Sequence, residues 1–517
     1  MRWNKSDAAS CYVLFLLAVL PTLFLRDFTP ANELRYLSIA EEALRNHTFF
    51  TFTNHGVAYA DKPPLYFWWV MLGKWMFGTH RMWFLSLASL VPALITVRTM
   101  DKWVEGEMPD TNRTIARMML LTGGLFAGLA VTLRMDMLLC MFIVLALREF
   151  HRMTRPQENR NRSALLLGLY TFLAVFSKGM VGLLVPLCSS VVYLLWNGEI
   201  KTLFRYWGWR TWVLPLLAAT LWLGAVYAES GTEYLHNLVF HQTFDRAVNS
   251  FHHKAPFYYY AIAVWYSIAP WSLVVISIIG MAAVRRLPLF NLQRLFAATA
   301  ASTFVMLSCI SSKLQVYLLP AFPFIIYLAA FHLQTMARER WLKIILSVTA
   351  SIFVCALPTI IIVANIGETA YLAHRLLFAA ATVMTLAGLL ALWRVFRKQS
   401  EVKDVVGTLF HGLLATLFIG GCALPAINPW IGYGALCQKT KEIANEKHTR
   451  KISALELRRP ENMDALMGLP VNELKEKDLG LLRTSHRTVV MLRRKYLKYF
   501  PDKKACIVGP NAVIYID

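Results

Sequence analysis

The sequence predicts an all-α membrane protein that crosses the bilayer many times and ends in a small extracytoplasmic α/β domain. Hydrophobic residues make up 57% of the 517 residues and charged residues only 16%, whereas soluble domains carry about 25% charged residues. The apolar residues gather in runs of about 20, the length that a helix needs to cross a bilayer. The basic residues fall mainly in short segments between these runs. Together these observations exclude an ordinary soluble protein.

The chain up to residue 430 contains about thirteen apolar runs of spanning length. The strict alternation of a membrane barrel is absent, so we expect helices. The first run follows Arg2 and Lys5, as a signal peptide would, but no small-residue cleavage site closes it, and we interpret it as an uncleaved first span. The runs lie near 10–26, 81–100, 115–133, 135–150, 163–176, 179–196, 212–228, 257–281, 295–312, 316–334, 341–364, 371–394 and 405–426.

The basic loops between these runs all fall on one side of the membrane. Cytoplasmic loops carry an excess of Lys and Arg, so this side is predicted to be the cytoplasm. The opposite face receives two long loops, 27–80 and 229–256, and the C-terminal segment. The net charge of +22 therefore reflects topology, and we expect no nucleic-acid partner. The basic loops are 148–162, 197–211, 282–294, 334–343 and 394–404.

The C-terminal segment, residues 431–517, becomes charged and mixed in composition and is predicted to form a separate small α/β domain beside a membrane domain of residues 1–430. Cys437 and Cys506 fall in it and could pair in an oxidising compartment. Strand-like pieces are expected at 451–457, 505–508 and 513–516, and helical pieces at 471–474 and 492–499.

The first long outer loop carries two groups of unusual polar residues. Asn32, Glu33 and Arg35 open a helix that is predicted to run to about residue 45 with an apolar stripe. Asp61 and Lys62 precede two prolines and a Trp-rich stretch, which is typical of an amphipathic helix lying in the membrane interface. Both groups place charge where a lipid headgroup would lie.

Four further polar groups are predicted to lie on the same outer face. Ionisable residues at membrane depth are costly and are therefore functional candidates. Several cations on one face suit a phosphate or pyrophosphate, and a nearby acid can act as a general base for an acceptor hydroxyl. The groups are Arg134 with Asp136, Lys178, His252 with His253, and Lys313.

Each of these residues also has an ordinary structural explanation. Asn32 could be a helix N-cap and Glu33 a first-turn acid, Asp61 could cap the helix after the prolines, and the two lysines could extend to the interface. Arg134 and Asp136 could form a structural ion pair, and the histidines could be surface residues. The individual signals are weak, and their shared face is what favours a functional site.

Read in order, the motifs of this face resemble those of the bacterial aminoarabinose–lipid A transferases. That family belongs to the GT-C class, which also holds the protein O-mannosyltransferases. The resemblance covers about residues 25–325 in motifs and the whole chain in span count. The motifs are Asn-Glu-Leu-Arg-Tyr (32–36), Asp-Lys-Pro-Pro-Leu-Tyr-Phe-Trp (61–68), Arg-Met-Asp (134–136), Ser-Lys-Gly (177–179), His-Lys-Ala-Pro-Phe-Tyr-Tyr (253–259) and Ser-Lys-Leu followed by Tyr-Leu-Leu-Pro (312–320).

The resemblance implies inverting sugar transfer from undecaprenyl phosphate, without a nucleotide. The family's first motif carries an Asp that is the usual candidate base, and Asn32 stands in its place here, with Glu33 and Arg35 in register. The second acid of the family is matched by Asp136. Three alternatives follow for the catalytic position of Asn32: Glu33 has taken the role of the base, Asp136 carries it, or the chemistry of the enzyme has drifted.

The same resemblance implies the phosphate-binding residues and a metal. Lys62 matches the family's donor-phosphate lysine, and Arg35, Arg134, Lys178 and Lys313 are the further cations expected to bind phosphate. A divalent metal such as zinc would bind between Asp61 and His253 or His252, where it could order the loops or polarise the phosphate.

Three hypotheses remain open at this point. The first is a glycosyltransferase of the bacterial inner membrane that faces the periplasm and acts on lipid A or another envelope acceptor. The second is an enzyme like the protein O-mannosyltransferases, with a protein or glycan acceptor. The third is a lipid transporter, which is disfavoured because transporters place polar groups near the bilayer midplane, often in repeated halves. Here the polar groups gather at one face and no halves repeat.

Overall fold

The structure is a computed structural model, which describes residues 5–155, 159–239, 254–397, 399–483 and 486–517. The chain forms two compact units. Unit 1 comprises Met1–Leu20, Ala60–Tyr66 and Ser86–Ile419, and unit 2 comprises Pro21–Tyr59, Phe67–Leu85 and Gly420–Asp517.

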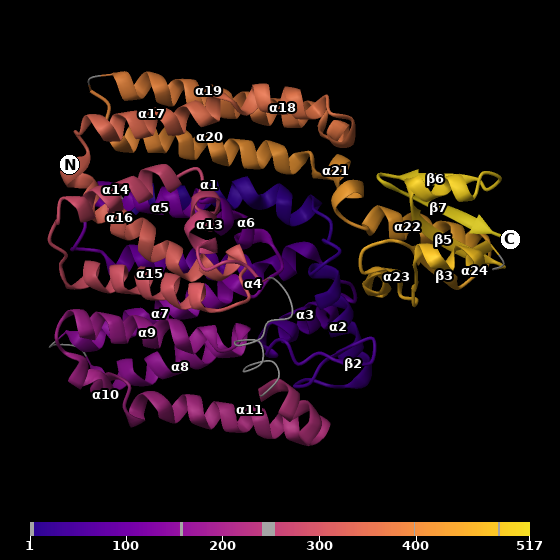
Figure 1. Cartoon of the computed structure of the whole chain (residues 1–517), viewed down its shortest axis with the longest axis horizontal. Helices are drawn as coiled ribbons and strands as arrows, with labels where there is room; N and C mark the ends of the chain where they lie inside the picture. The colour runs from indigo at the N-terminus through magenta and orange to yellow at the C-terminus, as the bar shows by residue number, and fades with distance from the viewer. Residues whose placement is uncertain (1–4, 156–158, 240–253, 398, 484–485) are drawn as a thin grey trace. The chain divides into compact units, whose positions relative to one another are not determined.

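Unit 1 is built from helices (Figure 1). Helices α7, α8 and α11 pack in succession, α9 packs against α8 and α15, and α16 contacts α5, α14 and α15. The helices are α1 (Lys5–Leu25), α4 (Met82–Trp103), α5 (Asp110–Thr122), α6 (Gly124–Val131), α7 (Asp136–Thr154), α8 (Arg160–Lys178), α9 (Val181–Trp196), α10 (Leu203–Tyr206), α11 (Trp209–His236), α13 (Tyr259–Ser267), α14 (Ser272–Val284), α15 (Asn291–Cys309), α16 (Phe322–Met336), α17 (Arg340–Val354), α18 (Ala356–Ala364), α19 (Arg375–Phe396) and α20 (Val402–Cys422). The short 3-10 helices are η1 (Ile200–Thr202), η3 (Gln315–Ala321) and η4 (Gly367–Leu372).

The helices confirm a multi-pass membrane protein. In the described part of the chain, 8 helices are long and apolar enough to cross a bilayer, or up to 9 if the bent pair α5 and α6 forms one span. The predicted number of thirteen is not confirmed. Each predicted run lies largely in helices, but 115–133 is bent between α5 and α6, 257–281 is divided between α13 and α14, and α9 and α14 are shorter than a full span.

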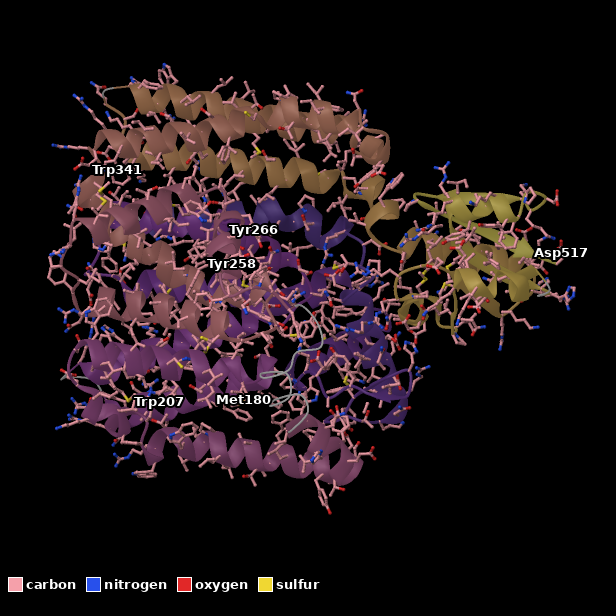
Figure 2. The ribbon with its side chains drawn as sticks, viewed as in Figure 1. Met180, Trp207, Tyr258, Tyr266, Trp341 and Asp517 are labelled. Atoms are coloured by element: carbon pink, nitrogen blue, oxygen red, sulfur yellow. The ribbon has the colours of Figure 1, made fainter. Side chains whose placement is uncertain are left out.

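Large apolar side chains remain exposed on unit 1, as expected for helices that face lipid. Leu216 of α11, Ile362 of α18 and Leu386 of α19 are 61%, 65% and 59% exposed, and Tyr266 of α13, which is labelled in Figure 2, is 49% exposed. In water such a surface would be unfavourable by roughly 25 cal/mol for each Å² of apolar area. In the hydrocarbon of a bilayer the same surface carries no such cost.

A buried polar network joins four helices of unit 1. The Asp101 carboxylate on α4 accepts a hydrogen bond from Arg117 Nε on α5 at 2.5 Å and from the Tyr12 hydroxyl on α1 at 2.9 Å. The Tyr327 hydroxyl on α16 donates to the other carboxylate oxygen of Asp101 at 2.6 Å. Because an unpaired charge in this environment would be very costly, the network fixes how the four helices meet.

Unit 2 combines the helices of the segment 27–80 with a five-stranded sheet in the C-terminal segment (Figure 1). Helix α3 (Leu65–Phe77) begins in unit 1 and continues into unit 2. The other elements are α2 (Glu33–Asn46), β1 (Thr53–Asn54), β2 (Val57–Ala58), α21 (Leu424–Ile431), α22 (Gly434–Glu446), β3 (Lys451–Leu455), η5 (Pro460–Met463), α23 (Asp464–Met467), β4 (Asn472–Leu474), η6 (Glu476–Asp478), α24 (Leu479–Arg483), β5 (Thr488–Arg493), η7 (Arg494–Tyr499), β6 (Ala505–Val508) and β7 (Asn511–Ile516).

The sheet has the strand order β4-β3-β5-β7-β6, with β3 parallel to β4 and β5 and with β7 antiparallel to β5 and β6. Helix α22 packs against β5 and β7. The expected helix at 471–474 is a strand, because Asn472–Leu474 pairs with Ser453–Leu455. The expected helix at 492–499 is divided between β5 and η7. Short apolar runs have no decisive periodicity, and here the neighbouring strand determined the conformation.

Helices α2 and α3 of the first outer loop are present at the expected places, and their location at the membrane interface stays a prediction. Helix α2 packs against η5 and α23 of the C-terminal part of unit 2. On its other side, Glu42 accepts hydrogen bonds from the Thr53 hydroxyl at 2.6 Å and from the backbone N–H groups of His55 and Gly56 at 2.6 and 2.8 Å. These bonds fix the β1–β2 hairpin to the helix.

A charged triad within unit 2 joins α2 to the end of α3. Glu41 accepts from Lys74 at 2.6 Å and lies 3.1 Å from Nε2 of His80. Burial alone would raise the pKa of Glu41, but the hydrogen bonds from His80 and Lys74 outweigh it and lower the pKa from 4.5 to about 2.

This lowered pKa predicts how unit 2 responds to acid. The Glu41 interactions stabilise the folded state fully above pH 4.5, and this contribution is lost as the pH falls from 4.5 towards about 2. We expect Glu41→Gln to lower the apparent unfolding temperature in detergent at neutral pH. The difference from the wild type should shrink across that acidic window. A difference that is independent of pH would contradict a role of the charged carboxylate.

Candidate active site

The candidate site of unit 1 forms where two antiparallel helices meet. Asp136 is the first residue of α7 and Lys178 is the last residue of α8. The two helices pack against each other, and Ser163 near the start of α8 donates to Glu149 near the end of α7. The helices therefore run in opposite directions, and Asp136 meets Lys178 at their other ends. A carboxylate at a helix N-terminus and a cation at a C-terminus are each favoured by the helix dipole.

Asp136 is the buried centre of this group. Its side chain is 1% exposed. One carboxylate oxygen accepts from Arg134 Nε at 2.8 Å, and the other pairs with the Lys178 ammonium. Lys178 also lies over the ring of Tyr317 in η3, 4.6 Å from its centroid. Burying a carboxylate is affordable only with such partners, and Asp136 in turn holds the two cations side by side.

Lys62 is the third cation of the group. It lies near enough to Lys178 for their charges to repel. Its ammonium is 3.1 Å from the carboxylate of Asp61 and also bonds the Asp61 carbonyl. The five ionisable groups of this cluster, three cations and two carboxylates, leave a net charge of +1. This excess suits an anionic ligand that contacts several cations at once.

Lys313 stabilises its own turn of the chain. Its side chain is 5% exposed and donates to the carbonyl of Ile310, just after α15 ends. A backbone bridge between Lys254 and Ser312 brings the end of the second outer loop to this turn. His252 and His253 lie outside the described residues.

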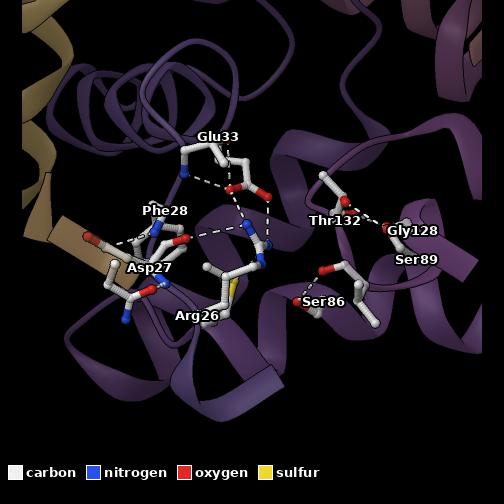
Figure 3. Close-up of polar contacts among 12 residues, drawn as sticks. Arg26, Asp27, Phe28, Glu33, Ser86, Ser89, Gly128 and Thr132 are labelled. Atoms are coloured by element: carbon white, nitrogen blue, oxygen red, sulfur yellow. Dashed lines mark hydrogen bonds and ion pairs between the residues drawn. The ribbon is translucent and has the colours of Figure 1, made fainter. Parts of the chain in front are cut away.

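In unit 2, Glu33 anchors the start of α2 (Figure 3). Its carboxylate receives two hydrogen bonds of 2.7 Å from the guanidinium of Arg26. The backbone N–H and the hydroxyl of Thr29 donate to it at 2.8 and 2.9 Å. Glu33 is fully buried. This geometry supports the ordinary explanation of Glu33 as an acid that stabilises the first helical turn.

Asn32 and Arg35 interact with each other in unit 2. Asn32 occupies the N-cap position of α2, but its side chain makes no capping hydrogen bond. It accepts instead from Arg35 at 3.2 Å. The Arg35 guanidinium also lies over the rings of Tyr59 and Tyr36, at 5.5 and 5.8 Å from their centroids. An amide in place of a carboxylate leaves the positive charge of Arg35 uncompensated by residue 32.

A metal site is not built by the described residues. Asp61, the expected acidic ligand, is paired with Lys62, and both expected histidines lie outside the described residues. Within the described ranges, no group of three or more His, Cys, Asp and Glu side chains could hold a metal ion. The metal therefore stays a prediction, and no step is assigned to it.

Three features of these sites could not be recognised from the sequence. Tyr317 was expected only as part of a motif, and its ring lies against Lys178. Arg26, at the end of the first span, was not expected to bind Glu33, although a buried acid in a first turn calls for a cation nearby. Ser86 and Ser89 lie inside an apolar run of the sequence, which did not indicate that their hydroxyls bond the backbone next to Arg134 and Asp136.

The buried pair in unit 2 predicts a double-mutant cycle. Arg26→Met or Glu33→Met alone leaves a buried charge without its partner, and each should destabilise unit 2 by about 3–5 kcal/mol. The double variant should recover much of the lost stability, because both charges are removed together. Thermal unfolding in detergent measures the three variants. Additive losses would show that the two residues are not coupled.

Comparison with known proteins relates the chain to bacterial transferases. No family model matches the sequence. The undecaprenyl phosphate-alpha-4-amino-4-deoxy-L-arabinose arabinosyl transferase of Shewanella sediminis is 25% identical over 358 residues, which are 68% of this chain and 64% of the relative. The transferase of the same name from Pectobacterium atrosepticum is 26% identical over 374 residues, 69% of this chain and 66% of the relative. The matches thus span just under two thirds of these relatives.

The fold agrees over nearly the whole chain. The crystal structure of ArnT from Cupriavidus metallidurans bound to undecaprenyl phosphate superposes with a TM-score of 0.77, over 99% of this chain and 97% of that chain, at 18% identity. The same protein in the apo state gives a TM-score of 0.74. The chain therefore has the fold of ArnT, and it is similar in sequence to the aminoarabinose transferases.

Proposed function

We propose that this protein transfers a sugar from a polyprenyl-phosphate carrier to an acceptor at the extracytoplasmic face of the bacterial inner membrane. The observation that carries the proposal is the pair of cations, Arg134 and Lys178, that the buried Asp136 binds, together with Lys62, whose charge acts on Lys178. The donor class is suggested by the undecaprenyl phosphate in the names of the relatives and in the superposed crystal structure. The side of the membrane follows from the positive-inside pattern of the loops.

The cluster fits the charge that develops during such a transfer. The bond between the sugar's anomeric carbon and the phosphate oxygen breaks, and its electron pair remains on the departing polyprenyl phosphate. The acceptor oxygen attacks from the opposite face, so the configuration inverts. Cations already in place stabilise the developing phosphate charge without reorganisation, and Lys62, Arg134 and Lys178 serve this role in the proposed mechanism.

Asp136 is the acid that we assign to the site. Its first role is to hold Arg134 and Lys178 in place through its two carboxylate oxygens. A carboxylate oxygen can accept more than one hydrogen bond, so Asp136 can also orient an acceptor hydroxyl. Glu33 is engaged by Arg26 and Thr29, and its role in the proposal is to position α2 with Asn32 and Arg35. The double variant Arg26→Met with Glu33→Met tests this role. If it recovered stability but did not transfer sugar, Glu33 would instead be assigned a role in the chemistry.

Asn32 favours a phosphorylated acceptor of the lipid A type. A phosphate oxygen is already ionised at neutral pH, so the attack needs no general base. An amide at the position of the family's acid would then be tolerated, and in this chain that amide accepts a hydrogen bond from Arg35. A protein or glycan hydroxyl would need a base, which makes the mannosyltransferase-like alternative less consistent with Asn32.

The proposal predicts that Lys62→Ala abolishes transfer. Loss of one preorganised donor at the site of developing charge typically lowers the turnover by on the order of 10²–10³-fold. Lys102→Ala removes an exposed lysine from the last turn of α4. It is the matched control and should keep full activity. Transfer is measured with purified protein and a synthetic polyprenyl-phosphate sugar, with lipid A, a glycan and a peptide as separate acceptors.

The acceptor that receives the sugar distinguishes a lipid A-type transferase from a mannosyltransferase-like enzyme. Product on lipid A alone supports the phosphorylated acceptor, and product on the peptide or glycan alone supports the mannosyltransferase-like enzyme. Full activity of Lys62→Ala would contradict the donor assignment. Mass spectrometry of envelopes from cells with and without the gene should show a matching lost glycoform, and an unchanged envelope in cells that contain the protein would contradict the proposed transfer.

A further inference from the structure

The backbone that carries Arg134 and Asp136 is a corner between two helices. Helix α6 ends at Val131, and α7 begins at Asp136. Thr132 is extended, with φ −90° and ψ 143°, and Met135 has φ −78° and ψ 0°. The carbonyl groups at the end of a helix lack partners within the helix, and at membrane depth each needs a donor from elsewhere.

Two serines of α4 supply these donors (Figure 3). The Ser89 hydroxyl lies 2.7 Å from the Thr132 carbonyl oxygen and 3.0 Å from that of Arg134. The Ser86 hydroxyl, one helical turn earlier, donates to the Val131 carbonyl at 3.2 Å. Both serines are fully buried. The two side chains therefore bond successive parts of the same corner.

We propose that Ser89 is a positioning residue for the cationic cluster. Its single hydroxyl hydrogen can be shared between the carbonyl oxygens of Thr132 and Arg134, the residues before and after Leu133. The Arg134 carbonyl belongs to the peptide bond that leads through Met135 to Asp136. Fixing this peptide sets the direction in which the Arg134 and Asp136 side chains leave the backbone, and through Asp136 the place of Lys178. This inference rests on the proposed function of the cluster.

Ser86 differs from Ser89 in the carbonyl groups that its hydroxyl bonds. It has the same chemistry, burial and helix, but its single carbonyl partner closes α6 and lies outside the segment 132–136. Thr132, whose hydroxyl donates to Gly128 at 2.7 Å, also stabilises the end of α6 locally. Ser86→Ala is therefore the matched control for Ser89→Ala, since both remove one buried hydroxyl from α4.

The test compares kcat and KM for the lipid-linked donor in the wild type, Ser89→Ala, Ser86→Ala and Ser89→Thr. Small displacements of groups that contact the reacting atoms can cost on the order of 10²-fold in rate. We expect Ser89→Ala to lower kcat between about tenfold and a hundredfold with little change in KM. We expect Ser86→Ala to keep kcat within about threefold of the wild type. Ser89→Thr retains the hydroxyl donor and should recover most of kcat.

A second measurement is independent of activity. Amide hydrogen exchange should be faster for residues 133–137 in Ser89→Ala, whereas in Ser86→Ala any increase should be confined to the end of α6. Equal losses of kcat in the two alanine variants, or an unchanged kcat in Ser89→Ala, would overturn the proposed positioning role. If the wild type itself transferred no sugar, the proposed function would fail, and the exchange rates would still decide whether Ser89 fixes the corner.

Discussion

The arrangement of unit 1 around its site depends on one buried carboxylate. Asp136 is 1% exposed and joins Arg134 and Lys178, so it holds together two cations that would otherwise repel each other. Its place at the N-terminus of α7, and that of Lys178 at the C-terminus of α8, lets both helix dipoles support the pair. The pair of Asp136 and Lys178 is thus built into the packing of two helices, whereas Arg134 and Lys62 are held on the short segments before α7 and α3.

Hydrogen bonding of the backbone is the second constraint. Helices end within unit 1, and each end leaves carbonyl groups that lipid cannot satisfy. At the corner before α7 the donors come from serines of α4, and in the Asp101 network tyrosines complete the partners of a carboxylate. Small hydroxyl groups in apolar helices thus determine where the charged side chains of the interior can lie.

The sequence predicted the membrane class and most of the helical runs, because composition reports these properties directly, and the shared outer face of all the polar motifs stays a prediction. The predicted topology placed Asp136 and Lys178 on the same side of the membrane, although 42 positions separate them, and the structure pairs them. The sequence could not predict which cation each acid would bind. Glu33 matched a motif for chemistry, yet the fold pairs it with Arg26, and Ser89 is indistinguishable from any small residue of an apolar run until α4 and the corner are placed. The strand at 472–474 was missed because its pairing partner is set by the sheet.

Within unit 2, the residues that follow the first span are bonded to residues that follow the last one. Asn428 bonds the backbone of Leu25 and Asp27, and the carboxylate of Asp27 accepts from the N–H of Gly434, where a side chain would collide with Asp27. These contacts join positions about 400 residues apart. Asn428 and Gly434 follow Leu25 and Asp27 in the chain by about 400 residues, so these contacts can form only after most of the chain has been synthesised.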